Sequence, residues 1–299
     1  MSEVETGGLA TTPAPNGTLR IAVPNKGLLA EPAAAMLAEA GYRQRGDGGR
    51  ELVLVDADNN AEFFFLRPRD IAVYVGSGTL EVGITGRDLL LDSGAAAEEL
   101  LPLGFGTSTF RFAARPGTAA SVADFAGMRV ATSYPGLLAK FFADEGVDAE
   151  VIRLDGAVET AVQLGVADVV ADVVSTGTTL RQAGLVLVGE PIMTSEAVLI
   201  ARASAEPPAG VQQLLRRLQG VLVARRYVLM DYDIRVERVE EACAITPGIE
   251  SPTVSPLHRE GWVAVRAMVP RSDAHKVMDE LWEIGARAIF VTDIHACRL

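Results

Sequence analysis

The chain repeats a pattern of strand, glycine-containing loop and helix, and this repeat limits its possible folds more than any other feature. The segment Arg20–Val23 is followed by Gly-Leu-Leu-Ala at 27–30, and Arg129–Thr132 is followed by the same four residues at 136–139, an offset of 109 (129 − 20). A second pair, Gly78–Val82 and Gly165–Val169, has an offset of 87 (165 − 78), and in both copies an apolar strand then leads to Thr-Gly. The sequence therefore predicts two similar α/β lobes.

Each predicted lobe has mostly parallel strands joined by helical crossovers. The chain is expected to cross to the second lobe near Thr107–Arg111 and to return near Thr194–Ala197, after which Glu196–Ala201 rejoins the first lobe as a strand. Ligands of such sheets bind beyond the carboxyl ends of the strands, so two facing lobes would share one cleft. This α/β arrangement resembles the type II fold of periplasmic binding proteins.

The pattern changes after the Pro-rich segment Ser204–Gly210, where an amphipathic helix is expected over 211–224. Beyond it, strands are predicted at 227–234, 252–257, 262–269 and 287–294, with helices at 236–244 and 272–284. The order βαββαβ is typical of a ferredoxin-like domain. The expected domains are a flexible tail (1–18), lobe I (19–108 with 195–216), lobe II (109–194) and a C-terminal domain (217–299).

The stretch from Glu159 to Leu180 carries the clearest chemical signal. It contains a short helix, a strand over Val169–Val174 with Asp172 inside it, a loop of hydroxyl and glycine residues at 175–179, and a new helix start. Unpaired backbone N–H groups at a helix start, next to glycine, predict an anion site. Amides that hold a phosphate beside a carboxylate that accepts sugar hydroxyls would suit a ribose 5-phosphate. The alternative is an ordinary helix cap beside a solvated acid.

The spacing within this stretch resembles the signature of the ATP phosphoribosyltransferases, the first enzymes of histidine biosynthesis. The matching residues are Glu159, Gly165, Ala167, Val170, Asp172, Val173, Thr176, Gly177, Thr179 and Leu180. The resemblance extends over nearly the whole chain after about the first eighteen residues, and it is to the long, histidine-regulated form.

This resemblance implies that adenine N1 of ATP attacks the anomeric carbon of 5-phosphoribosyl diphosphate and that diphosphate leaves. Because this nitrogen is a weak nucleophile, the protein is expected to supply alignment and charge stabilisation, with Mg²⁺ on the diphosphate and no covalent protein nucleophile. Glu159 is the candidate for a direct contact with the metal, and the alternative for both Glu159 and Asp168 is a solvated or helix-start carboxylate. The residues expected to bind phosphoribosyl diphosphate are Asp155, Glu159, Asp168, Asp172, Ser175, Thr176, Gly177, Thr178 and Thr179.

Residues at strand ends of the first lobe are assigned to ATP. A lysine in a loop is usually solvated, but Lys26 follows a buried strand and would face the cleft. Arg111 lies at the expected lobe crossing, where a guanidinium can clamp anions. Tyr134 is interpreted as a packing residue rather than as a platform for adenine. The expected ATP-binding set is Lys26, Gly27, Arg67, Gly86, Arg87, Asp88 and Arg111.

The resemblance also implies that the C-terminal domain binds L-histidine as a feedback inhibitor and that the chain forms homo-oligomers, from dimers to hexamers. Carboxylates would hold the ammonium group of histidine, and amides and hydroxyls would hold its carboxylate. The expected residues are Asp231, Asp233, Thr246, Ser251 and Thr253, which without the resemblance would be interpreted as an ordinary strand end and turn.

Composition narrows the class of protein further. The net charge of −12 argues against nucleic acid as a partner. No apolar run is long enough for a membrane span, and the N-terminus lacks the basic start and apolar core of a signal peptide. Cys243 and Cys297 have no metal-binding spacing, so reduced thiols in a cytoplasmic protein are expected.

Two competing functions share these features. A non-catalytic two-lobed module that binds or senses a small ligand would fit the fold, but it would not need Asp172 ahead of a hydroxyl-rich loop. A phosphoribosyl diphosphate enzyme with another acceptor would share the phosphate loop and differ in the acceptor pocket. The extent of the resemblance favours the enzyme that uses ATP.

Overall fold

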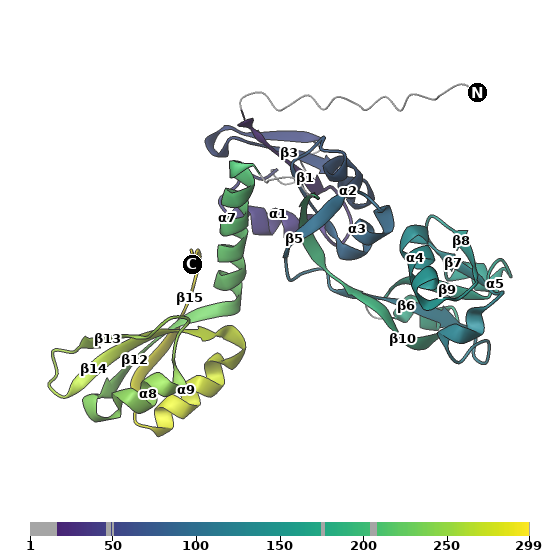
Figure 1. Cartoon of the computed structure of the whole chain (residues 1–299). Helices are drawn as coiled ribbons and strands as arrows, with labels where there is room; N and C mark the ends of the chain where they lie inside the picture. Colours follow the sequence, from purple (N-terminus) through teal and green to yellow (C-terminus); the bar gives the residue numbers. More distant parts are fainter. Residues whose placement is uncertain (1–16, 46–48, 50, 175–176, 204–207, 299) are drawn as a thin grey trace. The chain divides into compact units, whose positions relative to one another are not determined.

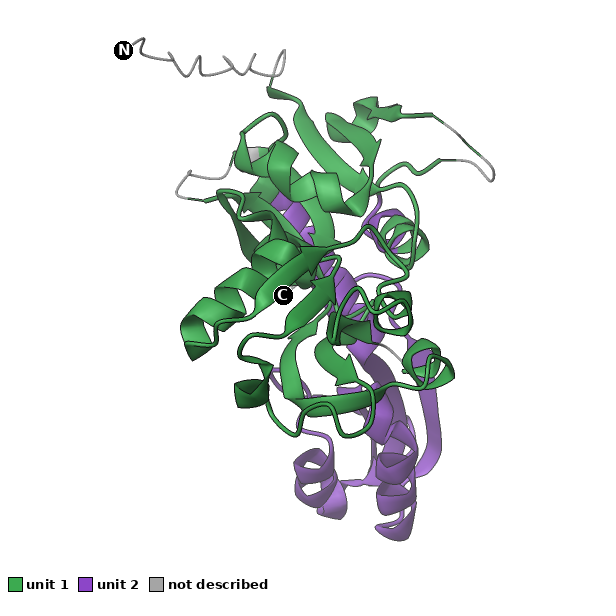
Figure 2. Ribbon diagram, turned by 90° about the vertical axis from the view of Figure 1, so that its right-hand side faces the viewer, with its two compact units in different colours: residues 1–35, 42–212 green, residues 36–41, 213–299 purple. Residues whose placement is uncertain are grey.

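The computed structural model describes residues 17–45, 49, 51–174, 177–203 and 208–298. The chain forms two compact units: unit 1 contains residues 1–35 and 42–212, and unit 2 contains residues 36–41 and 213–299 (Figure 1). Figure 2 shows the two units in different colours. Most of the expected tail lies outside the described residues, and the finer domain bounds given above stay a prediction.

The first sheet of unit 1 has the strand order β2-β3-β1-β4-β11-β5. Its strands are β1 (Leu19–Pro24), β2 (Val53–Asp56), β3 (Ala61–Leu66), β4 (Val82–Gly86), β5 (Ala97–Pro102) and β11 (Ala197–Arg202). The accompanying helices are α1 (Ala30–Glu39), α2 (Pro68–Gly76) and α3 (Arg87–Ser93). Strand β11 is antiparallel to both of its neighbours, β4 and β5.

The second sheet has the order β10-β6-β9-β7-β8. Its strands are β6 (Ser108–Ala114), β7 (Arg129–Thr132), β8 (Glu150–Arg153), β9 (Val169–Val174) and β10 (Val186–Ser195). The helices are α4 (Pro135–Glu145), α5 (Thr160–Gln163) and α6 (Thr178–Gln182). The chain therefore enters this sheet at Ser108 and leaves it at Ser195, within the two crossing segments expected from the sequence.

The internal repeat is present in three dimensions. In the first sheet β1 is parallel to β4 with Ile21 opposite Val82, and in the second sheet β7 is parallel to β9 with Val130 opposite Val169. The repeat even preserves an ion pair at the start of these strands. Arg20 Nη2 lies 2.7 Å from Glu81 Oε1, and Arg129 Nη2 lies 3.0 Å from Asp168 Oδ1.

The order of strands in the two sheets is equivalent once the repeat is applied. The order β3-β1-β4-β11-β5 in the first sheet corresponds to β8-β7-β9-β6-β10 in the second. Within these five strands, β11 and β6 are each antiparallel to their neighbours. Each is also the first strand that the chain forms after it crosses from the other sheet. Unit 1 is thus a pair of α/β lobes with the architecture of type II periplasmic binding proteins, as predicted. The first sheet is called lobe I below and the second lobe II.

Unit 2 has the predicted ferredoxin-like order of elements. Its sheet has the order β13-β14-β12-β15. The elements are α7 (Ala209–Arg226), β12 (Tyr227–Arg235), α8 (Val239–Ile245), β13 (Thr253–Pro256), β14 (Trp262–Pro270), α9 (Ala274–Glu283) and β15 (Arg287–Asp293). Figure 1 shows α8 and α9 on one face of this sheet. Alternate residues of β12 are buried in the core that these helices share, so the residues between them face the other side.

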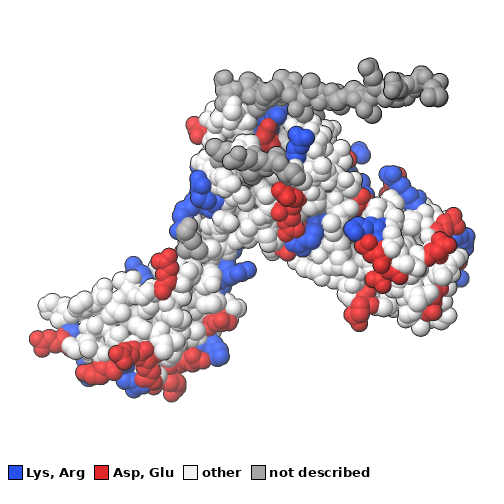
Figure 3. Space-filling view, in the orientation of Figure 1, with Lys and Arg blue, Asp and Glu red and all other residues white. Residues whose placement is uncertain are grey.

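The charges on the surface and the character of the helices agree with the composition of the sequence. Figure 3 shows acidic side chains interspersed with basic ones on the visible face of the protein, whose net charge is −12. Among the described residues, no helix combines the length and the apolar character that crossing a bilayer requires.

Candidate functional site

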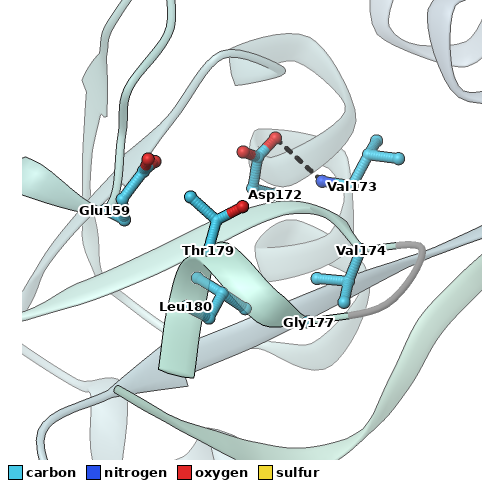
Figure 4. Close-up of a pocket in the computed structure, with 7 residues that line it drawn as sticks. All are labelled: Glu159, Asp172, Val173, Val174, Gly177, Thr179 and Leu180. Carbon is cyan, nitrogen blue, oxygen red and sulfur yellow. Dashed lines mark hydrogen bonds between the residues drawn. The ribbon is translucent and has the colours of Figure 1, made fainter. Parts of the chain in front are cut away.

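A polar hollow lies at the carboxyl end of β9, the central strand of lobe II. β9 is hydrogen-bonded between β6 and β7, and its first three residues are fully buried. The hollow has a volume of about 220 Å³ and is lined by Glu159, Asp172, Val173, Val174, Gly177, Thr179 and Leu180 (Figure 4). All seven residues belong to the stretch that the sequence singled out, and the structure brings the predicted acid together with Gly177 and Thr179 of the predicted loop.

Asp172 is the central acid of this hollow. Its Oδ1 accepts a hydrogen bond from the backbone N–H of Val173 at 2.8 Å. Burial, followed by the nearby carboxylates of Glu159 and Asp88, raises the pKa of Asp172 to about 6, although the Val173 N–H and Arg69 act in the opposite direction. A carboxylate whose charge is incompletely compensated is poised to accept hydrogen bonds from a ligand.

A glycine in the left-handed conformation lies just before α6, the helix that follows β9. Gly177 has φ +70° and caps α6, which has five residues. The helix begins two residues earlier than expected and is short, so its macrodipole contributes little and an anion here would depend on local N–H groups and hydroxyls. Ser175 and Thr176, both assigned to the same ligand, lie outside the described residues.

The other acids assigned to phosphoribosyl diphosphate differ in position. Glu159 precedes α5 and lines the hollow. Asp155 is exposed, with its Oδ1 3.7 Å from Arg153 Nη2. Asp168 precedes β9, at the opposite end of the strand from the hollow, and its Oδ2 accepts from the backbone N–H of Arg129 at 3.0 Å. Hydrogen bonds from the Arg129 guanidinium, followed by this backbone bond, lower the pKa of Asp168. We therefore correct its assignment from ligand binding to a structural ion pair.

The residues assigned to ATP are of two kinds: some are exposed, and others already bond to residues of the chain. Lys26 and Arg67 are exposed, and neither forms an ion pair within the described part of the chain. Gly27, beside Lys26, has φ +77° and open space around its Cα. These residues remain available to a ligand.

Arg87 and Asp88 of lobe I both bond to other residues of the chain. Arg87 Nε lies 2.8 Å from Glu99 Oε2, and Arg87 Nη2 lies 3.2 Å from Glu196 Oε1, so its guanidinium joins the start of α3 to β5 and to the residue before β11. This geometry corrects its assignment to ATP. Asp88, two residues after the buried Gly86, is buried and accepts a 2.8 Å hydrogen bond from Ser195 Oγ at the end of β10.

Arg111 lies on β6, directly opposite Asp172 in the strand register. Its Nη2 donates to the carbonyl of Gly189 at 3.1 Å, and its buried Nε has no hydrogen-bond partner in the described structure. Arg111 lines a second hollow of about 450 Å³ with Arg181 and with apolar residues of β10. The two hollows share Val174, Gly177 and Leu180, so they adjoin each other at the carboxyl end of β9.

Sequence reasoning missed one residue near Asp172, Arg69, and assigned another, Tyr134, to packing alone. Arg69, at the start of α2, lies 4.9 Å from the ring centroid of Tyr134. Burial and the carboxylates of Asp88 and Asp172 raise the pKa of the Tyr134 hydroxyl, which places this ring among the acids of both lobes. The available signal for Arg69 was its place two residues after Arg67, and the pattern gave no reason to prefer one over the other.

A protein-built metal site is absent from the described residues, because no three or more His, Cys, Asp or Glu side chains come together suitably. The hollow offers two carboxylates, from Glu159 and Asp172. Such a donor set fits Mg²⁺, which commonly binds one or two carboxylates and completes its coordination with water and substrate phosphates.

The residues assigned to histidine fall on two sides of the unit 2 sheet. Asp231 and Asp233 lie on the face of β12 away from its core, and Arg266 Nε lies 2.7 Å from Asp231 Oδ1. Thr253 is opposite Arg266 in the register of β13 and β14, and Ser251 is exposed just before it.

Thr246 lies elsewhere in this domain. Its hydroxyl is buried, donates to the carbonyl of Ala242 at 3.1 Å and lies 2.7 Å from the hydroxyl of Tyr232, on the core side of β12. The sheet separates Thr246 from the other four residues, so we correct its assignment to a structural one.

The fold of unit 1 defines a two-lobed α/β protein with an acidic hollow at the carboxyl end of a central strand, the place where small ligands bind in such sheets. The family model described as ATP phosphoribosyltransferase matches residues 67–220, and the model described as HisG, C-terminal domain, matches residues 224–296. The chain belongs to the ATP phosphoribosyltransferase family, and the enzyme catalyses the first step of histidine biosynthesis, with ATP and phosphoribosyl diphosphate as substrates.

Individual relatives agree with this membership. The ATP phosphoribosyltransferase of Streptomyces coelicolor is 67% identical over 285 residues, which cover 94% of this chain and 100% of that protein. The corresponding protein of an Arthrobacter species is 64% identical over 286 residues, with the same coverage. A solved ATP phosphoribosyl transferase (HisG:HisZ) complex from Thermotoga maritima has a TM-score of 0.57 at 23% identity and covers 68% of this chain and 98% of its own, which supports the fold.

Proposed function

We propose that phosphoribosyl diphosphate binds in the hollow at the end of β9, with Asp172 accepting hydrogen bonds from the ribose hydroxyls. The 5-phosphate would lie against the N–H groups and hydroxyls of Gly177, Thr178 and Thr179, together with Ser175 and Thr176. The position of a partly buried acid beside the loop carries this proposal. Substitution of Asp172 by asparagine, followed by measurement of kcat/KM for phosphoribosyl diphosphate, tests it.

ATP is proposed to approach from lobe I. Lys26, Gly27 and Arg67 offer exposed cations and an open backbone loop for its phosphates. Asp88 and Tyr134 would border the adenine side, because both lie near Asp172. Arg111 stays a candidate because its Nε has no hydrogen-bond partner in the described structure.

Mg²⁺ is proposed to bind through oxygens of the diphosphate, with Glu159 as the candidate protein ligand. When bound, the ion neutralises charge on the leaving group. The chain's own part is to orient the ribose through Asp172 and to hold the two substrates in line, since a bimolecular reaction gains most from alignment. The hollow offers two carboxylates and the hydroxyl of Thr179 rather than a base-activated nucleophile, in keeping with direct transfer between substrates.

Histidine is proposed to bind on the open face of the unit 2 sheet, at Asp231, Asp233, Ser251 and Thr253, and to inhibit from a distance. Inhibition of this kind requires two conformational states that histidine distinguishes. A homo-oligomer, from dimer to hexamer, and a cytoplasmic location are further parts of this proposal. They rest on the family and on the composition described above.

Asp231→Asn is expected to raise the histidine concentration for half inhibition at least tenfold, while kcat/KM stays within about twofold. The variant removes a charge that would attract the ammonium of histidine, and tenfold corresponds to about 1.4 kcal/mol. Histidine titration of the activity measures the effect. Asp293→Asn is the matched control, because Asp293 is an exposed partner of Arg271 in the same domain. Unchanged inhibition of Asp231→Asn would contradict the proposed site.

A further inference from the structure

The N-terminus of α4 in lobe II is bound by a carboxylate from lobe I. Asp92, in α3, accepts hydrogen bonds through Oδ1 from the backbone N–H groups of Gly136 at 2.9 Å and Leu137 at 3.2 Å. Its Oδ2 lies 2.7 Å from Arg69 Nη1, and the side chain of Asp92 is 8% exposed. Both oxygens of a nearly buried carboxylate are therefore used, one on each lobe.

The backbones of α3 and α4 approach so closely here that only glycine fits. A Cβ at Gly136 would lie 2.3 Å from the backbone oxygen of Asp92, well inside van der Waals contact. The repeat supplies an internal comparison, because Gly27 occupies the equivalent position in lobe I and has no heavy atom near its own virtual Cβ within 4 Å. The contact is thus a property of the second copy and not of the repeated fold.

The same contact extends to the proposed binding site. Arg69, the ionic partner of Asp92, lies over the ring of Tyr134, which immediately precedes α4. Tyr134 packs edge-on against Phe110 with ring centroids 5.4 Å apart, and its hydroxyl is close to Asp88 and Asp172. A series of contacts therefore runs from Asp92 through Arg69 to Tyr134, and the Tyr134 hydroxyl interacts electrostatically with Asp88 and Asp172.

We propose that Asp92 is a positioning residue: from lobe I it holds the start of α4 in lobe II, and with it Tyr134, in place beside Asp172. The proposal rests on the proposed function of Asp172. Asp92 acts through its neighbours and does not touch substrate. Displacement of a reacting group by about 1 Å can cost on the order of 10²-fold in rate, so an anchor outside the hollow can control activity.

The test compares Asp92→Ala, Asp92→Asn and Gly136→Ala with wild type in steady-state kinetics. We expect Asp92→Ala to lower kcat/KM for phosphoribosyl diphosphate about 30- to 100-fold, mainly by raising its KM, with a much smaller change in the KM for ATP. Asp92→Asn should recover part of the loss, because an amide oxygen can still accept from Gly136 and Leu137. Gly136→Ala should resemble Asp92→Ala, because its methyl group pushes α3 and α4 apart.

Asp144→Ala is the matched control. Asp144 is an exposed carboxylate on the same helix, 2.9 Å from Lys140, and its removal should leave the kinetics unchanged. Wild-type kinetics in folded Asp92→Ala would overturn the positioning role. The role would also be overturned if Asp92→Ala lost kcat/KM equally for both substrates, in step with its loss of thermal stability, and Asp92→Asn recovered none of that kcat/KM. An inactive wild type would instead overturn the proposed function, and this result appears before any variant is made.

Discussion

Asp172→Asn is expected to lower kcat/KM for phosphoribosyl diphosphate by about 10²- to 10³-fold, the loss typical of removing one preorganised charge-bearing group from an active site. The carboxylate can accept hydrogen bonds from two neighbouring hydroxyls, whereas the carboxamide offers one acceptor and presents a donor in place of the other. Initial rates at varied phosphoribosyl diphosphate and saturating ATP measure the effect.

The pH dependence of wild type should reveal the same group. The pKa of Asp172 in the free enzyme is about 6, so the acceptor form is lost as pH falls below this value. We expect kcat/KM for phosphoribosyl diphosphate to fall towards tenfold per pH unit below about 6. The corresponding profile of Asp172→Asn should lack this decline.

The free energy of unfolding should change with pH in the opposite direction from activity. Because the pKa of Asp172 is higher in the folded chain than the unfolded value of about 3.9, the folded state binds more protons between pH 4 and 6. Stability therefore falls as pH rises through this window, and the full cost is present above it. Asp172→Asn removes this cost and should stabilise the free protein at pH 8 by about 1–2 kcal/mol.

Asp168→Asn is the control that separates the two acids of β9. Asp168 pairs with Arg129 at the other end of the strand, so its loss should affect activity by less than about threefold and stability by at most about 1 kcal/mol. If Asp168→Asn were as inactive as Asp172→Asn, or if Asp172→Asn kept wild-type kinetics, the location of the site would be wrong.

Phe112→Ala is expected to destabilise unit 1 by about 3–5 kcal/mol, the usual cost of emptying the space of a buried phenylalanine. Phe112 lies on β6 beside β9 and is fully buried. Its ring centroid is 4.7 Å from that of Phe125 and 5.8 Å from that of Phe142, so the truncation removes aromatic contacts as well as apolar area.

Tryptophan fluorescence can show which unit loses stability. Its two tryptophans, Trp262 and Trp282, both lie in unit 2. Phe112→Ala should lower the unfolding midpoint seen by far-UV circular dichroism and leave the tryptophan fluorescence midpoint nearly unchanged. Leu164→Ala is the control, because Leu164 is 76% exposed in the same lobe. A cost below about 1 kcal/mol, or an equal shift in both signals, would contradict this account of the core.

The local pattern of apolar, polar and turn residues was enough to predict much of the fold. The strand Val169–Val174 has the predicted bounds, because its apolar residues are bounded by turn residues at both ends. The βαββαβ order of unit 2 followed from alternating apolar residues, as in β12. The internal repeat indicated two equivalent lobes, and the equivalent registers of β1 with β4 and β7 with β9 confirm it.

The candidate site was less predictable because ion pairs join residues far apart in the sequence. Asp168 and Arg87 look like candidate ligand contacts until their partners, Arg129 and Glu99, are known. Thr246 follows a helix and could face either side of the sheet, and only its contact with Tyr232 places it in the core. Asp92 gave no signal at all, because its role depends on a contact between two lobes.

The measurement that tests the central claim most directly is release of diphosphate from phosphoribosyl diphosphate in the presence of Mg²⁺, with and without ATP and with added histidine. We expect release that requires ATP and that histidine suppresses. Release that ATP does not stimulate, or no release by the folded protein, would contradict the enzymatic account, and ATP-dependent release that histidine leaves unchanged would contradict the proposed role of unit 2.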